Sequence, residues 1–195
     1  MPACGYISRG TSKDCYNPPV AGLKDRAILI NREDIVTHVF DVNNPLKVSD
    51  LVLKTGTKGY LIEGINNTLK GRDSSAPSTI GVTFTHEFDF VVLEAGPDAV
   101  QVAQELNYGR YVAVYEDNNN QFRIKGLNAG MKPTANGSDS ENVDLGGSYA
   151  ITLASDKEKG FSNFLFVEDV TNPETPVYDY AATKAVFDAL LVAAA

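Results

Sequence analysis

The chain has 195 residues, of which 43% are hydrophobic and 22% charged, a balance that excludes a largely disordered, collagen-like or coiled-coil protein. Seventeen Lys and Arg residues stand against 25 Asp and Glu residues, which gives a formal net charge of −8. A module that grips nucleic acid through a basic surface is therefore not expected.

The first 25 residues carry Gly, Pro, Asn and Ser with little periodicity, and they predict an N-terminal arm rather than a domain. Met1 to Tyr6 contain no basic stretch followed by an apolar core, so we expect no signal peptide. No apolar run approaches the roughly 20 residues of a membrane helix, so we expect that the chain does not insert into a membrane. We expect it to assemble in a cytoplasm. Cys4 and Cys15 are expected to be structural or bystander thiols, although the sequence does not fix their redox state.

The central part of the chain, residues 26–170, predicts one β-rich domain. Short apolar runs predict strands at 27–30, 36–42, 51–53 and 58–63. Residues 64–79 are polar and rich in Asn, Ser, Gly and Pro, and they predict a long loop that is locally basic at Lys70 and Arg72.

Residues 79–92 carry the clearest pattern in the chain. Six of the seven even positions are apolar, and the exception is His86. The odd positions include Thr83, Thr85, Glu87 and Asp89. Because side chains alternate along a strand, this pattern predicts a strand of roughly 45 Å with one buried face and one wet face. We expect His86 to be a packed, hydrogen-bonded residue.

A strand of this length needs an antiparallel partner, and Tyr60 with the residues before it is one candidate. Further along, Gly96-Pro97-Asp98 predicts the start of a helix that ends near residue 107. Two hairpins follow in the pattern, at 111–125 and at 149–167.

The last segment, residues 171–195, predicts a linker and a C-terminal helix over 178–192. Strands that come in hairpins favour a mainly β fold with a minor helical part. The expected architecture is an antiparallel β-sandwich or barrel with a long β-hairpin, one packed helix and a C-terminal helix.

No motif for nucleotide binding, catalysis or metal ligation is present, so the sequence predicts no enzyme, no cofactor and no metal. Glu116 and Asp117 are adjacent at a strand end, where a solvated turn is favoured over a carboxylate pair. Residues 136–144 contain Asp139, Glu141 and Asp144, but their spacing does not meet that of a calcium loop. Whether this acidic stretch holds a cation stays open.

About half of the chain resembles the major tail tube proteins of tailed bacteriophages, and the inner-tube proteins of contractile injection systems look similar. The resemblance lies in the order and length of four segments, at 79–93, 97–106, 111–125 and 149–167. In that family six copies form a ring, long hairpins close an inner barrel, and the rings stack into a tube with an acidic lumen through which DNA passes.

The resemblance implies a virion protein, assembled in the host cytoplasm, whose partners are its own copies, a sheath or terminator protein, a baseplate and, in passing, DNA. Alternation along the long strand makes Thr83, Thr85, Glu87 and Asp89 the candidates for the lumen. The candidates for contacts between rings are Lys70, Arg72, Tyr16 and Phe187. The Ala-rich C-terminal segment is not part of the family pattern.

Three alternatives stay open. The first is another virion β-domain, used for tail completion or capsid decoration. The second is a surface β-sandwich that binds glycan or protein, although the chain has no Trp and no visible signal segment. The third is a hydrolase with scattered acids such as Glu116 and Asp117.

Overall fold

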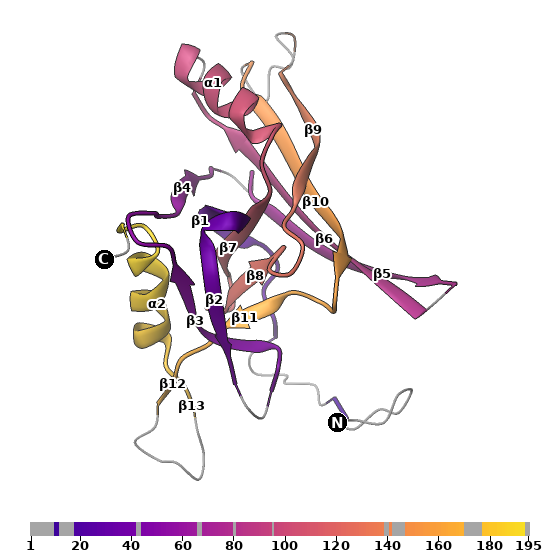
Figure 1. Cartoon of the computed structure of the whole chain (residues 1–195), viewed down its shortest axis with the longest axis vertical. Helices are drawn as coiled ribbons and strands as arrows, with labels where there is room; N and C mark the ends of the chain where they lie inside the picture. Colours follow the sequence, from indigo (N-terminus) through magenta and orange to yellow (C-terminus); the bar gives the residue numbers. More distant parts are fainter. Residues whose placement is uncertain are drawn as a thin grey trace.

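The computed structural model describes residues 10–11, 18–41, 44–65, 68–79, 81–94, 96–138, 141, 147–169 and 177–193. The described residues form a mainly β fold (Figure 1). Its strands are β1 (Leu23–Asn31), β2 (Ile35–Phe40), β3 (Lys47–Leu53), β4 (Tyr60–Glu63), β5 (Lys70–Ser78), β6 (Gly81–Val92), β7 (Tyr111–Asp117), β8 (Phe122–Lys125), β9 (Lys132–Ser138), β10 (Tyr149–Glu158), β11 (Asn163–Leu165), β12 (Glu168–Asp169) and β13 (Val177–Tyr178). The helices are α1 (Pro97–Leu106) and α2 (Tyr180–Ala189), with a single 3-10 turn at Arg32–Asp34.

Two sheets form the body of the molecule. Sheet A has seven strands in the order β2-β3-β11-β8-β7-β1-β4, and sheet B has four strands in the order β5-β6-β10-β9. All neighbouring strands are antiparallel except β11 and β3, which run parallel. The predicted fold class, a mainly β antiparallel sandwich with a long hairpin and two helices, is therefore confirmed.

Sheet A is covered on both faces, which explains why its central strands read as continuous apolar runs. All seven residues of β7 are buried. On one face, Val112 and Val114 belong to a cluster with Ile28, whereas Ala113 and Tyr115 on the other face pack against sheet B. Alternate residues of this single strand thus belong to two separate hydrophobic cores.

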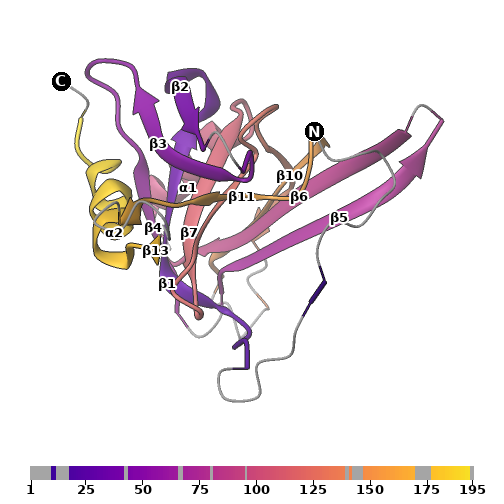
Figure 2. The ribbon, with the colours of Figure 1, turned by 90° about the horizontal axis from the view of Figure 1, so that it is seen from below.

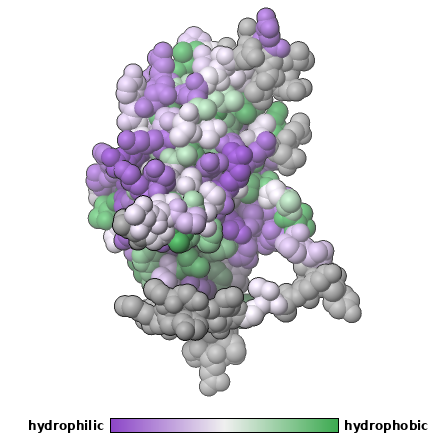
Figure 3. Space-filling view, turned by 90° about the vertical axis from the view of Figure 1, so that its right-hand side faces the viewer, coloured by the Kyte–Doolittle hydropathy of each residue, from purple (hydrophilic) through white to green (hydrophobic). Residues whose placement is uncertain are grey.

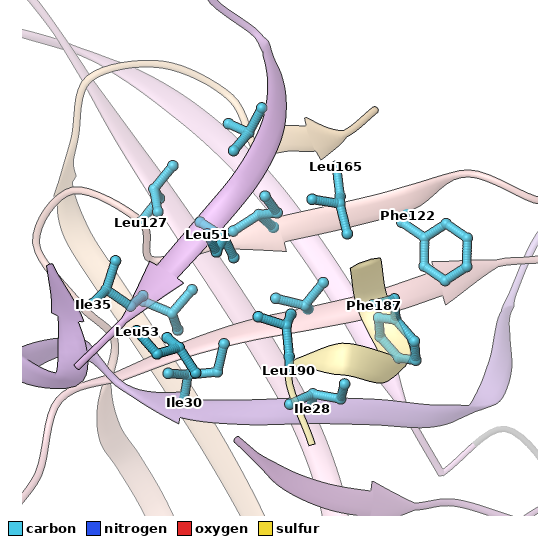
Figure 4. Packing of buried hydrophobic residues seen from close by; sticks show 14 residues of the cluster. Ile28, Ile30, Ile35, Leu51, Leu53, Phe122, Leu127, Leu165, Phe187 and Leu190 are labelled. Atoms are coloured by element: carbon cyan, nitrogen blue, oxygen red, sulfur yellow. The ribbon is translucent and has the colours of Figure 1, made fainter. Parts of the chain in front are cut away.

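Helix α2 covers the face of sheet A that points away from sheet B. Asp179 caps the helix by accepting a hydrogen bond from the amide of Ala182, at 2.9 Å. Phe187 of the helix and Leu190, which directly follows its last residue, point into the cluster (Figure 4), and the rings of Phe187 and Phe122 lie 4.9 Å apart. The predicted C-terminal helix is confirmed, and it belongs to the main body.

Helix α1 packs at the opposite end of the molecule, against β9 and β10 of sheet B. Its buried residues Ala103 and Leu106 close the upper end of the core between the two sheets (Figure 1). This helix and the β7–β8 hairpin that follows it were both predicted, and both are confirmed.

Strands β5 and β6 form an arm that extends beyond the rest of both sheets (Figure 2). The loop predicted over 64–79 is wrong for 70–78, which form β5 and pair with β6 along its full length, from Lys70 opposite Asp89 to Ser78 opposite Gly81. The suggested partner near Tyr60 is also wrong, because β4 pairs with β1. The outer part of β5 has both faces exposed, so it carries no apolar alternation that would reveal a strand.

One further strand was not predicted, and one predicted hairpin is wrong. The polar stretch 128–147 contains β9, which the composition did not indicate. The hairpin predicted at 149–167 does not form, because β10 pairs with β6 and β9 in sheet B while β11 pairs with β8 and β3 in sheet A. The chain crosses between the two sheets at residues 159–162 instead of turning back on itself.

The predicted N-terminal arm meets the body at the β7–β8 turn. The amide nitrogen of Val20 donates to Asn119 Oδ1 at 2.7 Å, and Asn118 Nδ2 donates to the carbonyl of Ala21 at 2.8 Å. Two turn asparagines therefore hold the chain just before it enters β1 at Leu23. Cys4, Cys15 and the predicted linker over 172–176 lie outside the described residues.

Candidate assembly surface

The candidate lumen residues lie on the outer face of sheet B. On β6, His86, Phe88 and Phe90 are buried against the core, while Thr85, Glu87 and Asp89 alternate with them on the other face. The alternation predicted from the sequence is therefore confirmed, and Thr83 continues it into the exposed arm.

The outer face is not acidic on β5 and β6, because β5 brings two cations to it. In the strand register Lys70 lies opposite Asp89 and Arg72 opposite Glu87. Arg72 Nε lies 2.9 Å from Glu87 Oε2, and Arg72 Nη2 lies 2.8 Å from Asp89 Oδ2. Arg72, predicted to contact the next ring, is paired with both candidate lumen carboxylates within its own chain, and its contact with another ring stays a prediction.

The rest of this outer face carries small side chains and one further cation, Lys132 of β9, which is exposed and lies opposite Ala154 of β10. In register with the β6 residues lie Ala150, Thr152 and Ala154 of β10, followed by Ala135 and Gly137 of β9. Figure 3 looks at the side of the molecule towards which the arm extends, and hydrophilic residues gather over the middle of that side. Small and polar side chains, with charges of both signs among them, give this face little capacity to bind an apolar partner.

Both edge strands of sheet B lack a partner within the described part of the chain. β5 pairs only with β6, and β9 pairs only with β10. An unpaired edge presents a row of free N–H and C=O groups that can accept another strand. Sheet B therefore offers two such rows at opposite ends of its width.

A buried charged cluster holds the base of the arm to sheet A. Lys125 of β8 is 1% exposed, and its Nζ lies 2.5 Å from Asp73 Oδ1 and donates to the Arg72 carbonyl at 2.9 Å. Ser162 Oγ donates to the other oxygen of Asp73 at 2.6 Å. β5, β8 and the crossover between the sheets therefore meet at one carboxylate.

Burial and hydrogen bonding set the charge states in this cluster. Burial lowers the pKa of Lys125, which its contact with Asp73 partly offsets. Burial alone would raise the pKa of Asp73, but hydrogen bonds from Lys125 and Ser162 outweigh it and hold that pKa below its usual value. Beside the cluster, a Cβ at Gly71 would lie 2.3 Å from the Tyr115 hydroxyl, so only glycine lets β5 cross this tyrosine.

His86 is packed and hydrogen-bonded, as predicted, and both of its ring nitrogens are engaged. The amide nitrogen of Gly126 donates to Nδ1 at 3.1 Å, and Nε2 lies 2.9 Å from the carbonyl of Gly160. This pair of contacts requires a neutral ring with its proton on Nε2, since an imidazolium has no acceptor for Gly126. Burial lowers the pKa of His86, with Asp73 and Glu158 opposing that shift and Lys125 adding to it.

This geometry predicts a loss of stability in mild acid. Because the pKa of His86 is lowered in the folded state, the unfolded chain takes up its proton first as pH falls below about 6.5. The free energy of unfolding should then fall by about 1.4 kcal/mol per pH unit until the lowered pKa is reached. Urea titrations at pH 7.5 and 5 measure this loss.

A His86→Gln variant serves as the comparison, since His38 also has a pKa lowered by burial, Arg32 and Lys159 and titrates in both proteins. The slope of the free energy of unfolding against pH should differ between the wild type and His86→Gln by the contribution of His86. An equal slope in both would contradict the assignment.

The other candidate residues fall into different places. The prediction that Phe187 contacts the next ring is wrong, because its side chain lies in the core and is only 2% exposed. Tyr16 lies outside the described residues. Lys70 is exposed on the edge strand β5 and stays a candidate.

The solvated turn predicted at Glu116 and Asp117 is also wrong, because both residues are buried. Glu116 pairs with Lys24 at 2.5 Å, and Asp117 pairs with Arg123 at 3.2 Å and accepts from the amides of Asn119 and Gln121. The two acids contact different partners, because adjacent residues of a strand point to opposite faces. Both contacts stabilise the local structure.

Over the described ranges, no group of three or more His, Cys, Asp or Glu side chains is arranged to hold a metal ion. Neither helix in the described part of the chain has the length and apolar character needed to cross a membrane. No family model, curated protein or solved structure gives a significant match to this chain.

Proposed function

We propose that the chain is a structural subunit whose copies join sheet B edge to edge into a closed ring, and that the rings stack into a phage tail tube. The observation that carries this proposal is the direction of the two free edges. Sheet B has four strands, each antiparallel to its neighbours, so its edge strands β5 and β9 run in opposite directions.

Copies related by rotation about one axis present β9 of one subunit to β5 of the next. Because β5 and β9 run in opposite directions, this junction is antiparallel, like every strand pair inside sheet B. The sheet can therefore continue from copy to copy with one strand pattern throughout, and closing the ring removes both exposed edges. A contact of this kind joins two different surfaces, so it forms a closed ring where the rotation between neighbouring copies divides a full turn.

The dimensions suit a channel. Four strands spaced about 4.8 Å apart make a wall about 19 Å wide per subunit. The six copies implied by the family resemblance give a radius of roughly 18 Å, or about 24 Å if the strands tilt by about 40°. That space accommodates a DNA duplex.

The chemistry of the wall limits its attraction for a polyanion that passes through. Phosphates are held by free Lys and Arg side chains. Arg72 is held by Glu87 and Asp89, and the β10 positions are small, so Lys70 and Lys132 are the cations of this face that have no ion pair among the described residues. The partners are then further copies, DNA in transit, and the sheath or terminator and baseplate proteins that end a tail.

A matched pair of proline variants tests the edge contact. Consecutive residues of a strand point their N–H groups in opposite directions, so Ser74 and Ser75 of β5 donate one towards β6 and one outward. One of Ser74→Pro and Ser75→Pro should therefore keep the wild-type melting temperature but stay monomeric. Light scattering after gel filtration, repeated over a series of protein concentrations, measures the mass of the assembly.

The outcomes separate the alternatives. Wild-type rings that never stack favour a tail-completion or capsid-decorating protein over a tube subunit. A wild-type protein that stays monomeric at every concentration contradicts the proposal. Two proline variants that both assemble normally contradict the role of β5.

A further inference from the structure

Three charged side chains form one unit on the outer face of sheet B. Arg72 on β5 lies between Glu87 and Asp89, which are two residues apart on β6 and share a face. One guanidinium contacts both carboxylates, at 2.9 Å and 2.8 Å. Two contacts from one planar group fix the arginine in place and leave fewer N–H donors for any other anion.

The carboxylates depend on this arginine. Their side chains are 36% and 21% exposed, whereas that of Arg72 is 60% exposed. Asp89 Oδ1 is buried and has no hydrogen-bond partner among the described residues, so its charge is compensated on one oxygen only. Without Arg72, two carboxylates about 7 Å apart would share a partly dry surface on which Lys70 is the one cation of the paired strands β5 and β6, with Lys132 of β9 two strands away from Glu87.

This inference rests on the proposed ring. In a closed wall every copy brings its own Glu87 and Asp89 to the same cavity, so any uncompensated charge is repeated around the circle. Like charges that line a cavity with low-dielectric walls reinforce one another. The repulsion grows with the number of copies, and it acts on the assembly more than on a single subunit.

We infer that Arg72 is the built-in counter-ion for sheet-edge association: its single positive charge offsets half of the charge of Glu87 and Asp89 within each copy and so permits identical copies to close one wall. It is a positioning residue of the interface and does not need to touch the neighbouring copy. Its removal should weaken assembly by repulsion between copies, and dissolved salt should relieve that repulsion.

Three proteins test the inference: Arg72→Gln, the neutral triple variant Arg72→Gln/Glu87→Gln/Asp89→Asn, and Arg26→Gln as the matched control. Arg26 pairs with Asp188 at 3.4 Å, and both of those side chains are about two-fifths exposed, so it reports the loss of an ordinary surface pair. Assembly is followed by light scattering in 20 mM and 500 mM NaCl, and the melting temperature of the dilute monomer is measured in parallel.

Arg72→Gln should need at least tenfold more protein to assemble at low salt, and high salt should restore most of that loss. The triple variant and Arg26→Gln should assemble like the wild type at both salt concentrations. Wild-type rings with an unaffected Arg72→Gln variant, or a triple variant as impaired as the single one, overturn this inference alone. A wild type that never assembles overturns the proposed function and this inference with it.

Discussion

Lys125→Met should lower the free energy of unfolding by about 3–5 kcal/mol, because it leaves Asp73 charged and without its cation at a buried junction. Lys125 is 1% exposed and contacts Asp73 at 2.5 Å, and Asp73 also receives the hydroxyl of Ser162. Loss of the ammonium group therefore leaves the Asp73 carboxylate, which joins β5, β8 and the crossover, without a cation. Urea unfolding at pH 7.5 measures the change.

Two comparisons separate charge burial from general damage. The double variant Asp73→Leu/Lys125→Met removes both charges and should recover much of the loss, since a buried pair replaced by apolar side chains is often close to neutral. Arg26→Gln, which breaks an exposed pair, should cost less than about 1 kcal/mol. A loss below about 1 kcal/mol for Lys125→Met would show that the cluster does not hold the arm.

Phe187→Ala should destabilise the monomer by about 3–5 kcal/mol through the cavity it leaves beneath α2. The ring is 2% exposed and lies 4.9 Å from the ring of Phe122, in a cluster that includes Ile28 (Figure 4). Thermal unfolding followed by circular dichroism, at a concentration below that of assembly, measures the effect.

Lys184→Ala on the same helix is the control, because its pair with Asp188 lies on the surface and should contribute only about 0.5 kcal/mol or less. The experiment also separates two roles for Phe187. A residue that contacts another ring would leave the monomer unchanged and weaken assembly only. That pattern would contradict the buried position described above.

Elements with a strong pattern of their own could be predicted from the sequence. The long alternation ending in Phe88 and Phe90 gave β6 and its two faces, because one face is buried and the other is not. The Asn-rich turn between Tyr115 and Phe122 gave the β7–β8 hairpin, since Asn120 adopts a positive φ of 59° that few residues tolerate.

Strands β5 and β9 could not be predicted in this way. β5 reads Lys-Gly-Arg-Asp-Ser-Ser-Ala-Pro-Ser and β9 reads Lys-Pro-Thr-Ala-Asn-Gly-Ser, and both are edge strands with no fully buried residue. Their structure comes from pairing with β6 and β10 rather than from burial of their own side chains. The crossover that separates β10 from β11 is likewise decided by which sheet each strand joins.

The charge pairing on the candidate surface does have a signal in the sequence. Lys70 and Arg72 are two residues apart, as are Glu87 and Asp89, and two strands paired across a hairpin would place these charges opposite one another. The prediction of a loop over 64–79 concealed that match. The buried roles of Asp73 and Phe187 carried no comparable signal, because each depends on a contact with a residue more than 50 positions away.

The most direct measurement is electron microscopy of the purified protein at raised concentration, carried to a map that resolves strands. We expect rings or tubes with a central hole, lined by sheet B with β9 of each copy beside β5 of the next and with Glu87, Asp89 and Arg72 facing the hole. Particles that stay single globules, or a hole lined by sheet A or by α2 with sheet B turned away, would contradict it.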